Sequence, residues 1–469
     1  MSNAQSKAGN EGLLSRLESF FMGRVYPAIV CLLVLVGHVF GIELWLSIPN
    51  VLLLALALYV SRSVRPFIVF ACTFIFSVSV QNGPGTPSYS DYYFTGYRLP
   101  IVIILFVIIF GSMAFFAVKN KIFRGISLTR TPLLLPLLVL SAAFLLNGAF
   151  SASWDVADLL MGVGEALIYT VLFLFFYFGI RSERREELID YFIYVSALIA
   201  IMLILQCGAL LVTSDGIIKD GSIVKEEVLL GWGIWNTVGV CLAVLIPVLF
   251  LGYMQKKNGW LYILLALATL ATAALTQSRN AILFGGIVFV ICLVISLAVG
   301  KRRLESVVLL GGLLVLAGLG DAILGGRLSG LLADVLSRGF ADNGRFELWR
   351  EGTSAFLSAP IFGSGFFTTV SDSAEFFPWM AHQTFVQLLA SMGIFGLLAY
   401  LYYRVMTVVP LIRRPRLDTV MLALSVGVLL AESLLDNFIF YFIPVIYYSI
   451  ALAIIHRDSW EDTSAPVLH

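Results

Sequence analysis

The stretch AHQTFVQLLASMGIFG (Ala381–Gly396) places a histidine directly before a run of apolar residues, 383–403, that is long enough to cross a bilayer. The chain has four histidines, and the other three lie near the end of an apolar run or in the polar C-terminal tail. His382 instead follows a long polar excursion. From this pattern alone, a structural role as an interfacial hydrogen-bonding group and a chemical role both remain open for His382.

The composition around this stretch belongs to a membrane protein. Of 469 residues, 59% are hydrophobic and 13% are charged, with a mean hydropathy of +0.95. Soluble globular chains have roughly 45–50% apolar and about 25% charged residues. The five cysteines all fall inside apolar runs and form no CxxC pair, so they are predicted to be small core residues. We expect membrane lipids, and no nucleic acid, around this chain.

Fourteen apolar segments meet the length that a spanning helix needs, about 17–25 residues. The first pair and the last pair are short, so the sequence predicts an all-α polytopic membrane protein with about 12–14 transmembrane helices. No cleavable signal peptide is evident before them. The segments lie near 25–41, 43–60, 66–82, 100–118, 132–149, 159–180, 191–213, 235–254, 260–277, 281–300, 306–324, 383–403, 419–435 and 438–455.

Lysine and arginine set the expected orientation, because cytoplasmic loops are enriched in both. With the N-terminus inside and the segments alternating, 22 of the 30 basic residues fall on the inner side. This predicts both termini in the cytoplasm. The expected organisation is an amphipathic N-terminal segment (1–24), transmembrane helices with short loops (25–324), a long external loop (325–380), C-terminal transmembrane helices (381–455) and a cytoplasmic tail (456–469).

The external loop is the only long connection in the chain, and four of the eight outer basic residues crowd into it. Loops of this length are usually functional or disordered. Its apolar side chains Phe346, Trp349, Phe356 and Leu357 fit one face of a helix, and the sequence after Pro360 stops that helix. We therefore predict an amphipathic helix at the outer membrane interface.

Three stretches expected on the outer side carry a recognisable series of motifs. A Ser-Arg pair (Ser278-Arg279) lies between two spans, and Gly-Arg-x-x-x-Trp (344–349) and Pro-x-x-Gly-x-Gly (360–365) follow in the loop. His382 then opens an apolar helix with Gly-x-x-Gly (393–396). This ordered series, over roughly residues 235–403, resembles the O-antigen ligase/polymerase superfamily of membrane glycosyltransferases, which implies a GT-C-like architecture.

The resemblance implies an enzyme that takes a glycan from an undecaprenyl-diphosphate carrier at the outer face of a bacterial plasma (inner) membrane. The acceptor is a hydroxyl on a second glycan (polymerase) or on another glycan or glycolipid (ligase). His382 is expected to be the catalytic base or the group that orients the acceptor. Arg279 and Arg345 are expected to hold the diphosphate, with Arg338 and Arg327 as further candidates, since a guanidinium forks onto phosphate oxygens.

Other residues are candidates for the acceptor site or its cavity. Arg98 ends a tyrosine-rich outer loop, and Glu432 and Asp436 are acids near the outer end of a span, where burial of an acid usually has a function. Trp349 is predicted to be an interfacial anchor. Gln383 stands where this family commonly has Asn or Ser after the histidine, which puts a direct hydrogen-bonding role there in doubt.

No DxD or HxxxH motif is seen, so we expect no required metal and no cofactor. A lipid-linked glycan transporter or flippase is an alternative function, although no repeat of the kind common in transporters stands out. A peptidoglycan polymerase of the shape-and-division type is a second alternative. It would prefer an external catalytic acid, for which Asp334, Asp342 and Asp372 are present. The sequence does not distinguish ligase from polymerase.

Overall fold

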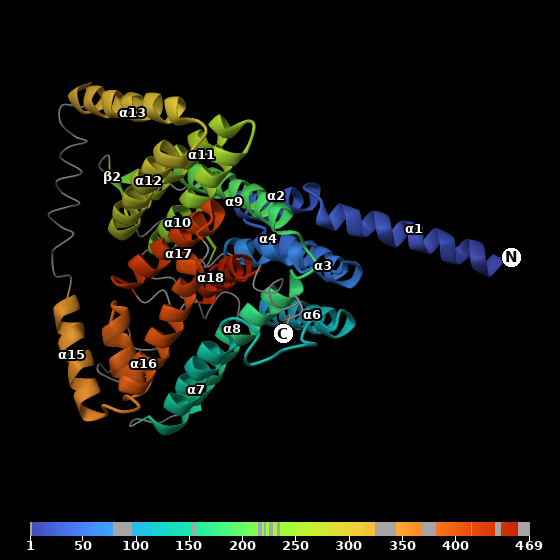
Figure 1. Ribbon diagram of the computed structural model, residues 1–469, viewed down its shortest axis with the longest axis horizontal. Coiled ribbons are helices and arrows are strands. Elements are labelled where there is room, and N and C mark those ends of the chain that lie inside the picture. Colours follow the sequence, from blue (N-terminus) through green and yellow to red (C-terminus); the bar gives the residue numbers. More distant parts are fainter. Residues whose placement is uncertain are drawn as a thin grey trace, which may run out of the picture.

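The computed structural model describes residues 2–77, 96–151, 156–213, 218–219, 222–224, 228–231, 235–323, 344–366, 381–413, 415–436 and 442–457 (Figure 1). Helices account for nearly all of these residues, and two short strands, β1 and β2, pair antiparallel. The elements are α1 (Ser2–Met22), α2 (Val25–Phe40), α3 (Glu43–Val60), α4 (Arg65–Thr73), η1 (Phe74–Ser77), α6 (Arg98–Lys119), α7 (Leu134–Phe150), α8 (Val156–Gly179), α9 (Arg185–Thr213), β1 (Ile218–Lys219), β2 (Ser222–Ile223), α10 (Trp235–Gln255), α11 (Gly259–Leu275), α12 (Arg279–Val299), α13 (Arg303–Ile323), α15 (Arg345–Ser358), α16 (Thr384–Arg413), α17 (Leu417–Ser433) and α18 (Phe442–Ile455).

The helices confirm the all-α polytopic class. Seven described helices are long and apolar enough to cross a membrane, and a pair bent by 60°, Gly12–Met22 with Val25–Phe40, makes up to eight. Four shorter apolar helices accompany them, at Arg65–Ser77, Leu134–Asn147, Gly259–Leu275 and Pro444–Ile455. The count of about 12–14 spans stays a prediction, because helices of this shorter length are marginal for crossing a bilayer.

Helix α10 is the central helix of the C-terminal half. It packs against α9, α11, α12 and α17, and 89% of its apolar window is buried inside the protein. Its sequence is apolar on every face, which is the pattern of a helix surrounded by other helices. The outer helices expose one face, as α6 does with Ile103, Val107 and Phe110. Such faces are suited to contact with lipid.

One predicted span, 66–82, is described only in part. Its described residues form α4 and the 3-10 turn η1, and residues 78–82 lie outside the described part. The Thr73 hydroxyl donates to the carbonyl oxygens of Val69 and Phe70, and the Ser77 hydroxyl donates to the carbonyl oxygen of Phe74. Side-chain hydroxyls that bond the preceding turn bend helices. These bonds lie where the α-helix gives way to the 3-10 turn.

Helix α16 extends beyond residue 403, where the predicted apolar segment ends. It continues to Arg413, so Arg404 lies within it. Its guanidinium lies over the rings of Tyr400, Tyr403 and Tyr448, at 4.5, 5.1 and 4.5 Å from the centroids. Aromatic faces stabilise a desolvated cation by cation–π attraction, which explains how a helix interior accommodates this charge.

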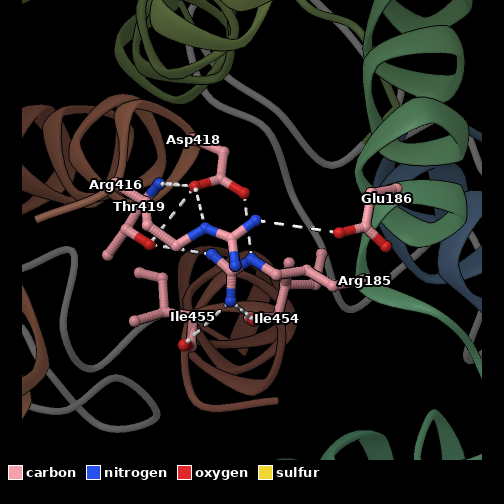
Figure 2. Close-up of polar contacts among 7 residues, drawn as sticks. All are labelled: Arg185, Glu186, Arg416, Asp418, Thr419, Ile454 and Ile455. Carbon is pink, nitrogen blue, oxygen red and sulfur yellow. Dashed lines mark hydrogen bonds and ion pairs between the residues drawn. The ribbon is translucent and has the colours of Figure 1, made fainter. Parts of the chain in front are cut away.

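At the end of the bundle assigned to the cytoplasm, a buried cluster joins three helices (Figure 2). Arg185 at the start of α9 donates through Nε to Asp418 Oδ2 at 2.9 Å and through Nη2 to Thr419 Oγ1 at 2.8 Å. Its Nη1 reaches the carbonyl oxygens of Ile454 and Ile455 at 3.2 and 3.3 Å. This cluster holds the start of α17 against α9 and the end of α18.

The same helix, α17, is fixed along its length. The Ser425 hydroxyl donates to the Val244 carbonyl of α10, and at the far end the Thr384 hydroxyl of α16 donates to the Ser433 carbonyl. These contacts, with the Arg185 cluster, set both the depth and the rotation of α17. The position of the residues just after it, including Asp436, follows from them.

Candidate functional site

The predicted loop helix exists and docks on the start of α16. Helix α15 begins after Gly344, whose φ of +79° suits glycine, and ends at Ser358, two residues before Pro360. Figure 1 shows α15 beside α16. The Trp349 indole Nε1 donates to the Ala381 carbonyl at 3.0 Å. Trp349 was predicted to be an interfacial anchor; in the structure it links α15 to the residue that precedes His382.

The glycine-rich segment after α15 packs into a break in α16. Gly393 interrupts that helix with φ +64° and ψ −164°, a conformation essentially restricted to glycine. The opened turn accepts the loop: Ser364 N donates to Ala390 O at 2.8 Å, and Ile394 N donates to Pro360 O at 2.9 Å. A Cβ on Gly363 would lie 2.3 Å from the Ser391 carbonyl carbon. The glycine motifs therefore serve close backbone contact.

His382 is held in an unusual backbone conformation at this junction. Its φ is +49°, which is uncommon for a residue with a side chain. On one side, Ala381 N donates to Gln387 Oε1 at 2.8 Å. On the other, the Gln383 Oε1 accepts from Val386 N at 2.6 Å and so caps the first turn of α16. Gln383 thus has a hydrogen-bonding role in the local fold.

The imidazole of His382 faces a carboxylate from another helix. His382 Nδ1 lies 3.1 Å from Asp436 Oδ1. The histidine side chain is 41% exposed and the aspartate side chain is 6% exposed. A buried carboxylate at Nδ1 favours the tautomer with its proton on Nδ1 and leaves Nε2 as the acceptor. His382 is therefore a positioned group whose side chain stays partly open to solvent.

A second acid lies one turn before Asp436. Glu432 is fully buried in α17, and neither of its carboxylate oxygens has a hydrogen-bond partner among the described residues. Burying a carboxylate without partners is costly, so such a group is a functional candidate by default. The structure therefore places both predicted acids, Glu432 and Asp436, at the end of α17 that reaches His382.

The predicted arginines differ in their surroundings. Arg345 begins α15, one turn before Trp349, and is half-buried. Arg350 pairs with Glu347 at 3.1 Å on the exposed face of α15. Arg279 begins α12 after Ser278, whose hydroxyl accepts from Ala281 N at 3.4 Å. Arg327 and Arg338 lie outside the described residues.

Helix α10 connects the Arg279 turn to the histidine site. A Cβ on Gly239 would lie 2.7 Å from the Ala281 Cβ, so the Ser278–Arg279 turn packs on the beginning of α10. The Ser425 hydroxyl of α17 contacts the Val244 carbonyl of α10, and Glu432, further along α17, interacts electrostatically with Cys241, nearer the beginning of α10. The end of α17 therefore lies beside the same beginning. Arg279, Glu432 and Asp436 thus share one end of the bundle with His382 and Arg345.

Arg98 is placed differently. It begins α6, whose main packing partner is α3, and its guanidinium lies 5.1 Å from the ring centroid of the neighbouring Tyr97. Nothing in this placement links Arg98 to the histidine site. Among the described residues, no three His, Cys, Asp or Glu side chains gather as metal ligands would. The expectation that no metal is required stays a prediction.

Sequence reasoning missed Asp158. Its Oδ1 accepts from Phe366 N at 2.5 Å, and the neighbouring Gly365 has room for no side chain, since a Cβ would lie 2.8 Å from Asp158 Oδ2. Asp158 therefore fixes the end of the glycine-rich segment against α8. The only signal in the sequence is that Asp158 lies in the first turn of an apolar span. Acids are common at this position because they complement the helix dipole, so the signal does not single out Asp158.

The chain was compared with known proteins and protein families. A search of curated proteins finds no match to the chain. Residues 263–401 match the family described as O-Antigen ligase, a segment that includes Arg279, Arg345, Trp349 and His382 and ends before Asp436. The segment that carries the arginines and the histidine is thus similar to the O-Antigen ligase family, which supports the resemblance to the O-antigen ligase/polymerase superfamily.

Proposed function

We propose that this protein transfers a glycan from an undecaprenyl-diphosphate carrier to a hydroxyl acceptor at the outer face of a bacterial inner membrane, with both termini in the cytoplasm. The family match supports an O-antigen ligase-type glycosyltransferase. The observation that carries the proposed chemistry is the contact of His382 Nδ1 with Asp436 Oδ1 at 3.1 Å. A buried carboxylate behind a half-exposed imidazole is the arrangement of an oriented general base.

In the proposed reaction the acceptor hydroxyl attacks the anomeric carbon of the donor glycan. A new carbon–oxygen bond forms as the bond between that carbon and the diphosphate oxygen breaks, and the electron pair leaves with the diphosphate. His382 Nε2 takes the hydroxyl proton. The Asp436 carboxylate then faces an imidazolium and stabilises its charge at the 3.1 Å contact.

The leaving diphosphate needs positive charge that is already in position. Arg345 and Arg279 supply it in this proposal, because a guanidinium keeps its proton and offers two parallel donors to phosphate oxygens. Fixed charges placed where negative charge develops are usually the largest catalytic contribution. Arg327 and Arg338 stay candidates for the same role. Arg350 is excluded from it here, since Glu347 already pairs with its guanidinium on the exposed face.

The two remaining groups near His382 have separate proposed roles. Glu432 stays a candidate for the wall of the acceptor cavity, since its fully buried oxygens lack partners among the described residues. Trp349 is proposed to position α15, and with it Arg345, relative to His382 through its bond to the Ala381 carbonyl.

The test is a paired measurement of donor affinity and transfer rate for wild type and His382→Ala across pH, with defined undecaprenyl-diphosphate glycans. Wild-type transfer should fall on the acid side, because a protonated imidazole cannot accept the hydroxyl proton. The variant should lose this acid limb and about a hundredfold or more of the rate, while donor binding persists.

The same assay separates the alternatives. An unchanged transfer rate in His382→Ala would leave His382 with a structural role only. Donor binding without transfer under all conditions would favour a lipid-linked glycan transporter or flippase. Elongated lipid-linked products indicate a polymerase, whereas transfer to a separate acceptor indicates a ligase.

A further inference from the structure

A polar cavity lies at the opposite end of α8 from the histidine site. It is formed by α1 and by the ends of α3, α6 and α8, and its volume is about 920 Å³. Helix α8 has 24 residues and so spans about 36 Å. Asp158, near its start, contacts the glycine-rich segment of the catalytic domain, and Phe178, near its end, lines this cavity. The cavity is therefore a separate site.

Positive charge predominates in the cavity lining. Arg62, Lys119 and Arg181 line it, and Glu18 is the one acid among the described residues of the lining. The Glu18 carboxylate already accepts a hydrogen bond from Arg62 N at 3.1 Å. Ser15, Ser182 and Asn120 add neutral polar groups to the wall. A cavity with three cations and one acid is complementary to a phosphate group.

Contacts within the cavity keep these cations in place without neutralising them. Lys119 Nζ donates to the Ser61 carbonyl at 3.0 Å and also to the Tyr59 carbonyl. Arg181 Nη1 reaches the Arg124 carbonyl at 3.5 Å. Both partners are neutral backbone oxygens. The Glu18 carboxylate, which also acts on Lys119, offsets at most one of the three positive charges, so net positive charge remains for an anion in the cavity.

An apolar groove continues from this cavity along the lipid-facing side of the bundle. It lies between α3 and α6, has a volume of about 510 Å³, and shares Tyr59 and Phe115 with the polar cavity. These two rings stack with centroids 5.5 Å apart. Leu56 and Val107 further along the groove are 41% and 65% exposed. The groove is therefore open for an extended hydrocarbon chain.

We infer that the cavity and groove together bind an anionic phospholipid of the leaflet at this end of the bundle. The phosphate headgroup occupies the cavity among Arg62, Lys119 and Arg181, and one acyl chain follows the groove past Tyr59 and Phe115. Basic pockets between transmembrane helices recognise anionic headgroups in this way. The continuous apolar groove is the reason to assign a lipid instead of a soluble phosphate. This inference is independent of the proposed glycan transfer.

Native mass spectrometry of the delipidated full-length protein with phosphatidylglycerol and phosphatidylcholine tests the charge requirement. The wild-type protein should bind phosphatidylglycerol at least tenfold more tightly than phosphatidylcholine. The double variant Arg62→Gln/Arg181→Gln should weaken that binding by about tenfold or more. The matched control Lys257→Gln/Lys301→Gln removes two exposed charges from the same end of the bundle, outside the cavity, and should change it less than twofold. Equal weakening by both pairs would mean unspecific surface attraction and overturn the site.

A second variant tests the groove and does not rely on the charged residues. Gly111 lines the groove, and a Cβ added there meets nothing within 4 Å, so Gly111→Phe fills the groove without a clash at its Cβ. It should weaken phosphatidylglycerol binding severalfold while all three cations remain. Unchanged affinity in Gly111→Phe, or full displacement of the lipid by inorganic phosphate, would overturn the lipid assignment.

Discussion

At the scale of single residues, the site depends on the contact between His382 and a carboxylate from a different helix segment, that of Asp436. His382 and Asp436 are 54 positions apart, and their side chains meet at 3.1 Å. His382 also keeps a positive φ of +49°, supported by the side chains of Gln383 and Gln387 on either side. Strained backbone of this kind tends to occur where function fixes a side-chain direction.

Asp436→Asn tests the proposed orientation of the imidazole. The amide is nearly isosteric, but its NH2 can donate to Nδ1 and stabilise the tautomer that carries its proton on Nε2. That tautomer cannot take a proton from the acceptor. We expect kcat to fall by about a hundredfold or more with donor affinity retained. The check is steady-state transfer kinetics with a parallel donor-binding measurement; wild-type kcat in the variant would refute the orienting role.

The arginines give a graded prediction. Arg279→Ala and Arg345→Ala should each lower kcat by about a hundredfold or more, by comparison with other preorganised donors. Lysine at either position should restore only part of the rate, because it lacks the forked pair of donors. Arg350→Ala is the matched control on the exposed face of α15 and should have a small effect. Near-normal turnover in Arg279→Ala, at normal expression, would assign that side chain to the headgroup region instead.

At the scale of elements, the break in α16 is what allows the loop to reach the helix. The Gly393 Cα lies against the loop so closely that a Cβ would be 2.4 Å from the Ile361 carbonyl oxygen. The same opened turn leaves backbone oxygens at Ala390 and Ser391 to accept from Ser364 N and Gly365 N. The helix break, the glycine-rich segment and the docking of α15 therefore form one unit.

Gly393→Ala should disrupt that unit. Its φ and ψ are nearly restricted to glycine, and strain of this kind costs about 1–3 kcal/mol before the clash with Ile361 is added. We expect a lower thermal unfolding temperature in detergent and a reduced transfer rate. Gly286→Ala in α12 is the control, since its Cβ meets nothing within 4 Å and should leave stability unchanged or slightly raised. Equal behaviour of the two variants would contradict this account of the break.

At the scale of the whole molecule, basic loops far apart in sequence meet at one end of the bundle. Arg65 pairs with Glu183 at 3.2 Å, and Arg457 Nε donates to the Glu183 carbonyl at 2.8 Å. Arg302 Nη2 donates to the Lys256 carbonyl at 3.1 Å. All of these basic residues were assigned to the inner side by the charge distribution. Lys256 also pairs with Asp190 near the start of α9, close in sequence to Glu183, which joins the two groups. These contacts support a single polar face, and the side of the membrane it occupies is a proposal.

Cysteine accessibility tests that orientation. In a background without the five native cysteines, single cysteines at Lys256 and Arg302 should resist a membrane-impermeant reagent in intact cells. A cysteine at Glu347 on the exposed face of α15 should react. External labelling at Lys256 or Arg302 would reverse the orientation and remove every external site assignment with it.

The sequence by itself determined the membrane class, the order of apolar segments, the loop helix α15 and the glycine turn after it. These follow from hydropathy, from the helical period and from the restricted conformations of glycine and proline, all of which are local properties. The ends of the helices did not follow from these properties: α16 continues ten residues beyond 403, and the Tyr400 ring covers the charge of Arg404 within it.

Only the tertiary structure decided which distant groups meet. In the sequence, Asp436 is one acid among several. In the structure, the Arg185 cluster and Thr384 fix the two ends of α17, and this placement brings Asp436 into contact with His382. The contact of Asp158 with Phe366 joins residues 208 positions apart. Such pairs depend on how whole helices pack and rotate against one another. A local sequence pattern therefore cannot predict which distant residue becomes the partner.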